Sequence, residues 1–175
     1  MNPLRHTTTL AATVLLLAGT GAARADDVSM AGGSIRFSTP ARWVDIMQTR
    51  GDPEVRVFQV PDPSPTGAAS LARVSVTVKQ VADLAAYNTY RSGAGAKARA
   101  LAGYAPAAAP ADAAGGSAYT ARENGLPYRY LEYYWFKGGE AVQLRCVRPQ
   151  QTAAGNAWKA DFDKSCHALA ARLGR

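Results

Sequence analysis

The chain has 175 residues, a formal net charge of +7 and 47% hydrophobic residues. This length suits one domain with a substantial core. Its basic residues, mostly arginine, are scattered along the chain, a pattern that favours solubility and a mild preference for acidic surfaces. No RNP-type motif or zinc-knuckle spacing accompanies the aromatic residues, so the sequence argues against a nucleic-acid partner.

Residues 1–25 have the pattern of a secretory signal peptide. A positive start with Arg5 precedes an apolar stretch at 10–18, and Ala25 completes an A-x-A cleavage motif. The apolar stretch is about half of the roughly 20 residues that span a membrane, so no membrane span is expected. We predict cleavage after Ala25, a periplasmic or secreted location, and one domain over 26–175 with a net charge of +5.

The first half of this domain is predicted to form short strands. Gly32 and Gly33 separate two apolar pieces, which indicates a tight hairpin. Apolar residues alternate over 54–60 and again over 71–81, so we expect a strand in each segment. The residues between these strands are rich in Pro, Gly and Ser and predict a loop.

A helix is predicted after Asp83, which is a suitable N-cap residue. Apolar residues recur at helical spacing from Leu84 to Leu101, although Gly93 and Gly95 weaken the middle of this pattern. The Ala-, Pro- and Gly-rich segment 102–117 is expected to be an ordered but irregular connection.

Two aromatic and apolar segments, 126–137 and 140–148, flank a Gly-Gly pair and predict a β-hairpin. Placing Lys137 opposite Glu140 puts apolar residues on one face and complementary charges on the other, as a correct register requires. This register pairs Trp135 with Val142, Tyr133 with Leu144 and Leu131 with Cys146 on one face, and Phe136 with Ala141, Tyr134 with Gln143, Glu132 with Arg145 and Tyr130 with Val147 on the other.

The last predicted helix covers about 156–173 and carries Cys166 inside its apolar stripe. Cys146 lies on the apolar face of its predicted strand. Both cysteines therefore point into the same layer, and an oxidising compartment favours a Cys146–Cys166 disulfide between the sheet and the helix. The stripe consists of Trp158, Phe162, Cys166, Leu169 and Leu173.

Reactive or metal-binding roles for these cysteines fit the sequence less well. A structural zinc site needs four ligands at short paired spacings, which the domain lacks. His167 projects about 100° away from Cys166 around the helix, so the two do not converge as a nucleophile and base, and we expect His167 on the solvent side. No serine-hydrolase, metalloprotease or phosphate-binding motif is present, so we predict no catalytic residue, metal or cofactor.

Glu132 is the one acidic residue set among aromatic residues. A buried carboxylate there would suit a general base, but Arg145 opposite it favours an ordinary cross-strand ion pair. A small hydrolase or lipid-handling enzyme that uses Glu132 or His167 is therefore kept as the alternative from another functional class.

The order of these elements resembles the PsbP/Mog1-like family of small α/β/α sandwiches, which includes bacterial proteins of the DUF1795 and DcrB type. The resemblance is a pattern of positions over nearly all of 26–175, and it departs at Arg42, where the family often has Gly. It rests on Phe37, Pro40 and Trp43 in FSTPARW, on VSVTV followed by Leu84 and Tyr90, on the block 115–146, and on Trp158, Phe162 and Leu169.

The resemblance implies an α+β fold, an antiparallel sheet with helices on both sides, and a mostly non-enzymatic role. It transfers no catalytic residue. The expected function is a periplasmic, non-catalytic protein-binding module that acts as an accessory or assembly factor of the cell envelope and binds another envelope or secreted protein. An immunity protein that neutralises a secreted toxin in the periplasm is the alternative within this class.

The second face of the predicted hairpin supplies the candidate binding residues. If the helix after Asp83 leaves part of this face open, aromatic and arginine side chains there are suitable anchors for a partner. Complete cover by that helix is the other possibility, since sandwiches cover both faces of a sheet. The candidate residues are Tyr130, Glu132, Tyr134, Phe136 and Arg145.

Overall fold

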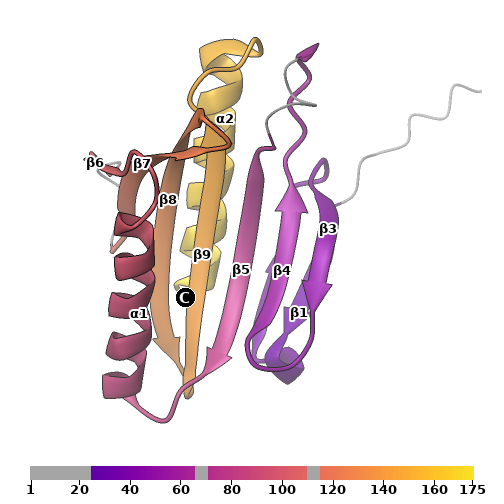
Figure 1. Ribbon diagram of the computed structural model, residues 1–175. Coiled ribbons are helices and arrows are strands. Elements are labelled where there is room, and N and C mark those ends of the chain that lie inside the picture. The colour runs from indigo at the N-terminus through magenta and orange to yellow at the C-terminus, as the bar shows by residue number, and fades with distance from the viewer. Residues whose placement is uncertain (1–24, 66–70, 110–114) are drawn as a thin grey trace, which may run out of the picture.

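A computed structural model describes residues 25–65, 71–109 and 115–175 (Figure 1). The predicted signal peptide, apart from Ala25, lies outside the described residues. Within them, seven strands form one antiparallel sheet in the order β3-β4-β5-β9-β8-β7-β6. The strands are β3 (Val44–Thr49), β4 (Glu54–Gln59), β5 (Arg73–Gln80), β6 (Ala105–Ala107), β7 (Ser117–Glu123), β8 (Leu126–Lys137) and β9 (Glu140–Pro149).

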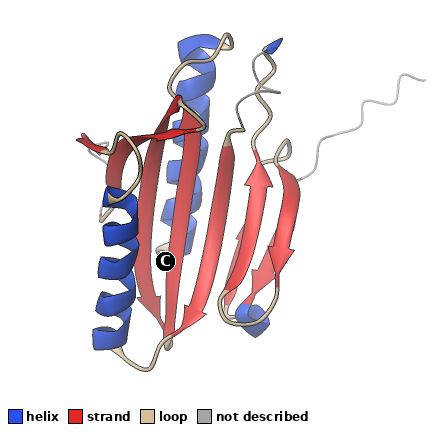
Figure 2. Cartoon of the chain, viewed as in Figure 1, coloured by secondary structure: helices blue, strands red, loops and turns tan. Residues whose placement is uncertain are grey.

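The back face of the sheet is covered by helix α2 (Gly155–Leu173) and by a separate hairpin of β1 (Asp27–Met30) and β2 (Ile35–Ser38). Figure 2 shows α2 behind the sheet and the other helix on the opposite side. Alternating valines of β5 face this side because successive strand residues point to opposite faces. The main core therefore lies behind the sheet and includes Phe37, Phe58, Val74, Val76, Val142, Leu144, Phe162 and Leu169.

On the front face, helix α1 (Leu84–Arg99) packs on β8 and β9. Asp83 caps this helix as predicted, and its carboxylate accepts a hydrogen bond from the Ala86 amide at 2.8 Å. The two layers on opposite sides of an antiparallel sheet confirm the predicted α+β fold class. Among the described helices, none is long and apolar enough to cross a membrane.

The aromatic hairpin has the predicted register at every pair. Lys137 lies opposite Glu140, and Glu132 lies opposite Arg145. Gly138 and Gly139 have φ values of 53° and 85°, which a two-residue hairpin turn of this kind requires and which glycine adopts without strain. The two glycines therefore fix which side chains of β8 and β9 share the front face.

Helix α2 is fastened to the sheet by two interactions. Cys146 and Cys166 form the predicted disulfide, with their Cα atoms 6.4 Å apart. Arg148 of β9 also donates two hydrogen bonds to the Asp163 carboxylate, at 2.7 and 2.8 Å. The predicted stripe faces the core, with Phe162, Cys166, Leu169 and Leu173 buried and Trp158 half-buried.

Several local expectations were wrong. Strands β3, β6 and β7 were not predicted, and part of the segment expected to be irregular, 102–117, contributes β6 and the first residue of β7. The first predicted hairpin, by contrast, is present, and its strands are joined by a short 3-10 segment, Ala31–Gly33. Leu84 is exposed at the start of α1, although it belongs to the apolar pattern that predicts this helix.

Candidate functional site

The front face holds a buried carboxylate that three side chains surround. The Glu132 side chain is only 2% exposed. Its Oε1 accepts hydrogen bonds from Arg145 Nε at 2.5 Å and from the Tyr119 hydroxyl at 2.9 Å. Its Oε2 accepts a hydrogen bond from the Tyr134 hydroxyl at 2.6 Å. We call these four residues the Glu132 cluster.

Three neighbouring strands bring the Glu132 cluster together. Arg145 of β9 lies directly opposite Glu132 of β8, and Tyr134 lies two residues further along β8 on the same face. Tyr119 comes from β7, on the other side of β8. Because the cluster spans three strands, its geometry depends on the register of both strand pairs.

Helix α1 is joined to the cluster by a chain of hydrogen bonds. The Tyr90 hydroxyl of α1 donates to Gln143 Oε1 at 2.9 Å, and Gln143 Nε2 donates to the Tyr134 hydroxyl at 3.0 Å. Each polar group in this chain has a partner, as buried polar groups require. The chain therefore positions α1 over the sheet by hydrogen bonds as well as by packing.

The electrostatics set the protonation states of the three side chains that surround Glu132. Burial, together with the nearby Glu132 carboxylate, raises the pKa of Tyr119 and Tyr134, so both hydroxyls remain donors. Burial alone would lower the pKa of Arg145, but the Glu132 carboxylate raises it above its ordinary value. The cluster therefore holds a charged guanidinium, an acceptor carboxylate and two neutral phenols.

A second cluster lies beside the first on the same face. Arg73 of β5 donates two hydrogen bonds to the Glu123 carboxylate, at 2.9 and 2.5 Å, and the Tyr130 hydroxyl donates to the same carboxylate. Tyr130 is buried, with its ring stacked on Tyr119 at a centroid distance of 4.6 Å. The stacked rings make the two clusters one contiguous polar and aromatic layer.

Because of the Glu123 carboxylate, we expect the folded protein to lose stability in acid. Burial would raise the pKa of Glu123, but hydrogen bonds from Arg73 and Tyr130 hold it below its ordinary value of 4.5. A depressed folded pKa contributes stability above about pH 4.5 that is lost as pH falls through the folded pKa. In urea denaturation from pH 6 to pH 3, we expect Glu123→Gln and Arg73→Met to flatten this dependence. An unchanged slope in both variants would contradict the assignment.

The five predicted binding residues lie in three different places on the front face. Glu132, Tyr134 and Arg145 meet in the first cluster, Tyr130 belongs to the second, and Phe136 lies beside Tyr87 of α1 with ring centroids 5.7 Å apart. Helix α1 thus covers much of this part of the face, while the Arg145 side chain remains 35% exposed. Sequence reasoning missed Tyr119 because its strand was not predicted.

Cys166 and His167 do not form a nucleophile and base. Cys166 is bonded to Cys146, so it carries no free thiol. His167 is half-buried beside Tyr133, with ring centroids 6.3 Å apart, which corrects the expectation that it faces solvent. In the part of the chain that the structure describes, no group of three His, Cys, Asp or Glu residues is placed to hold a metal ion.

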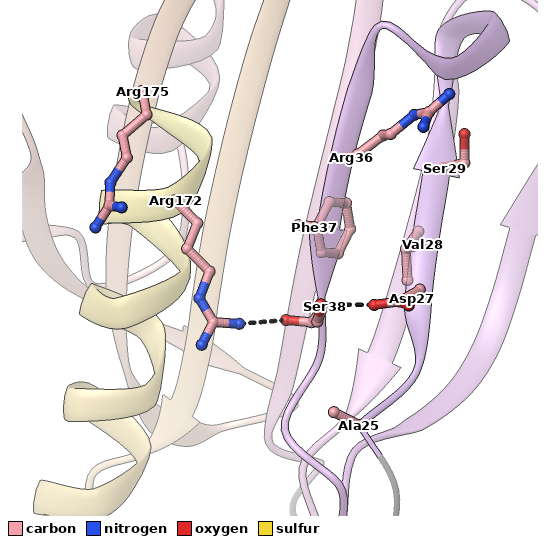
Figure 3. Close-up of a pocket in the computed structure, with 9 residues that line it drawn as sticks. All are labelled: Ala25, Asp27, Val28, Ser29, Arg36, Phe37, Ser38, Arg172 and Arg175. Atoms are coloured by element: carbon pink, nitrogen blue, oxygen red, sulfur yellow. Dashed lines mark hydrogen bonds between the residues drawn. The ribbon is translucent and has the colours of Figure 1, made fainter.

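A broad groove of about 970 Å³ lies on the other side of the molecule, between the β1–β2 hairpin and the end of α2 (Figure 3). Arg172 donates to the Ser38 carbonyl oxygen at 3.0 Å, and the Ser38 hydroxyl donates to Asp27 at 2.7 Å. Arg36 donates to the Gly33 carbonyl oxygen at 3.0 Å. These polar groups hold the hairpin together and against α2, so we assign the groove a structural role.

Comparison with known protein families finds no family model that matches the chain, and comparison with curated proteins finds no match either.

Proposed function

We propose that this protein is a non-catalytic binding module of the cell envelope, of the PsbP/Mog1-like type, that binds another envelope or secreted protein through strand β3. The observation that carries the proposal is the exposure of this edge strand. Val44, Ile46 and Met47 are 50%, 43% and 47% exposed, and we call these three residues the β3 patch. Several large apolar side chains in water on one edge are typical of an interaction site.

The position of β3 in the sheet supports a protein partner. It is the last strand on its side, so its outer edge has no strand partner among the described residues. Edge strands accept an extended segment of another protein by backbone hydrogen bonding, and neighbouring apolar side chains then add affinity. In the described part of the chain, no helix lies in front of β3, β4 and β5 (Figure 1).

The hydrogen bonds to Glu132 and the disulfide between the cysteines support a non-catalytic role. Both oxygens of Glu132 accept hydrogen bonds from neighbouring side chains, including the Arg145 guanidinium, and this arrangement is typical of a structural ion pair. The disulfide is consistent with the oxidising compartment that the predicted signal peptide implies. The PsbP/Mog1-like resemblance favours an accessory or assembly role.

Affinity capture from periplasmic extract tests this proposal. We expect residues 26–175 to retain a partner that an Ile46→Lys, Met47→Lys variant loses, because two ammonium groups oppose burial of the β3 patch. Leu126→Lys is the matched control, since Leu126 is 44% exposed at the start of β8, away from β3. Retention of the same partner by the double variant would contradict the proposal, as would its loss in the control.

A further inference from the structure

A separate cavity of about 330 Å³ lies between α1 and strands β7 and β8. Its size falls at the lower end of the range for small-molecule sites, about 300–1,000 Å³. Helix α1 forms one wall, and three aromatic residues with the Glu132 carboxylate form the other. The lining includes Arg91, Arg99, Tyr104, Tyr119, Glu132 and Tyr134.

The charge of this cavity is positive. Arg91 and Arg99 are eight residues apart on α1, so they lie on the same side of the helix and about 12 Å apart along its axis. None of the ion pairs between described residues involves either arginine. The one carboxylate in the lining, Glu132, is already paired with Arg145. Two guanidinium groups are therefore available to an anion.

Gly95 has no side chain, and the Arg99 guanidinium lies close to the middle of α1 at this position. A Cβ atom on Gly95 would lie 3.4 Å from Arg99 Nη1, so the arginine side chain folds back along the helix over this glycine. Gly95 lines the cavity, whereas a Cβ atom on Gly93 would meet nothing within 4 Å. Glycine weakens a helix relative to alanine, and a larger side chain at Gly95 would enter the cavity beside Arg99.

The opposite wall combines an aromatic surface with hydrogen-bonding groups. The half-buried Tyr104 ring packs on the buried Tyr119 ring at a centroid distance of 5.2 Å and provides apolar contact for a carbon skeleton. The Tyr119 hydroxyl donates a hydrogen bond to Glu132 and keeps a lone pair that can accept a hydrogen bond from a ligand hydroxyl. The wall thus suits a small molecule with hydroxyl groups better than a bare inorganic ion.

We propose that this cavity binds a small hydroxylated organic acid with two or three carboxylate groups. Arg91 and Arg99 each hold a carboxylate by charge-assisted hydrogen bonds, and Tyr119 accepts a hydrogen bond from the ligand hydroxyl. The cavity and the β3 patch lie on different elements. A ligand site here is therefore independent of the partner proposed for β3.

Isothermal titration of oxidised residues 26–175 with citrate and with malate tests the assignment, with acetate and sulfate as comparison anions. We expect citrate or malate to bind one site at least tenfold more tightly than acetate or sulfate. An Arg91→Gln, Arg99→Gln variant is expected to lose at least tenfold of that affinity. Lys97→Gln, Lys164→Gln removes the same charge outside the cavity and is expected to bind within twofold of wild type.

A pair of glycine variants separates filling of the cavity from loss of charge. Gly93→Leu and Gly95→Leu both introduce a good helix former, so thermal denaturation should show both proteins folded. Only Gly95→Leu places a side chain in the cavity, and we expect it alone to lose citrate binding. Absence of citrate and malate binding in the wild type would overturn the assignment, as would binding that survives both Gly95→Leu and the arginine variant.

Discussion

Replacing both Cys146 and Cys166 with alanine is expected to lower the free energy of unfolding by at least about 3 kcal/mol. The bridge closes a loop of 20 residues, and a cross-link of this length restricts the unfolded chain by roughly that amount. For a domain of this size, the loss corresponds to a decrease in Tm of about 6–12 °C. Thermal and urea denaturation of the variant beside the oxidised wild type measure both quantities.

Reduction of the wild type provides the control for this experiment. Both cysteines are buried, so the alanine variant also loses packing that the reduced thiols retain. We expect the reduced wild type to fall between the oxidised protein and the variant. Equal stability of the oxidised and reduced wild type would contradict a stabilising role for the bridge.

The sequence predicts those parts of the fold where the turn residues and the pattern of apolar residues indicate the same structure. The Gly138-Gly139 turn fixes the register of β8 and β9, and alternating apolar residues then identify the face that packs on α2. The same reasoning placed Cys146 and Cys166 in one layer. Their disulfide could therefore be predicted without knowledge of the rest of the sheet.

Two of the strands that the sequence did not reveal, β3 and β6, lack such a pattern. Every residue of β3 is exposed, so no alternation of buried and exposed positions exists to indicate a strand. β6 has only three residues and contains Pro106. These strands form because an existing sheet edge offers backbone partners, which is a tertiary effect that a local pattern does not contain.

The candidate site was predictable only in part for the same reason. Glu132 and Arg145 are cross-strand neighbours in a register that the sequence specifies, so their ion pair was expected. Tyr119 reaches Glu132 from β7, and Tyr90 reaches Gln143 from α1. These contacts, and the cavity beside them, depend on where α1 and β7 dock against the hairpin. Helical periodicity alone does not determine that placement.

Replacing Glu132 with alanine is expected to destabilise the fold by about 3 kcal/mol, the lower end of the range for breaking a buried charged pair. The Arg145 side chain is 35% exposed and regains some hydration, which reduces the penalty. The hydroxyls of Tyr119 and Tyr134 lose the acceptor to which they donate, and a void remains between β7 and β9. Urea denaturation at pH 7 measures the change.

An exposed ion pair provides the comparison for this prediction. Asp45 Oδ2 of β3 lies 2.6 Å from Arg56 Nη1 of β4. The side chains of Asp45 and Arg56 are 40% and 20% exposed. Asp45→Ala removes the same kind of interaction from a more solvent-exposed position. We expect it to lower the free energy of unfolding by no more than about 1 kcal/mol. A similar loss of stability in both variants would mean that burial of Glu132 does not increase the contribution of its ion pair to stability.

A double-mutant cycle isolates the contribution of the buried pair. Glu132→Gln keeps the volume and one acceptor oxygen, so we expect it to cost about 2 kcal/mol, less than alanine. Arg145→Met alone leaves the Glu132 carboxylate buried without its cation, and we expect it to cost more than the double variant Glu132→Gln, Arg145→Met. Because the double variant leaves neither charge unpaired, the two single effects should not add. Additive losses would show that Glu132 and Arg145 act independently and that the phenols, not the ion pair, hold the carboxylate in place.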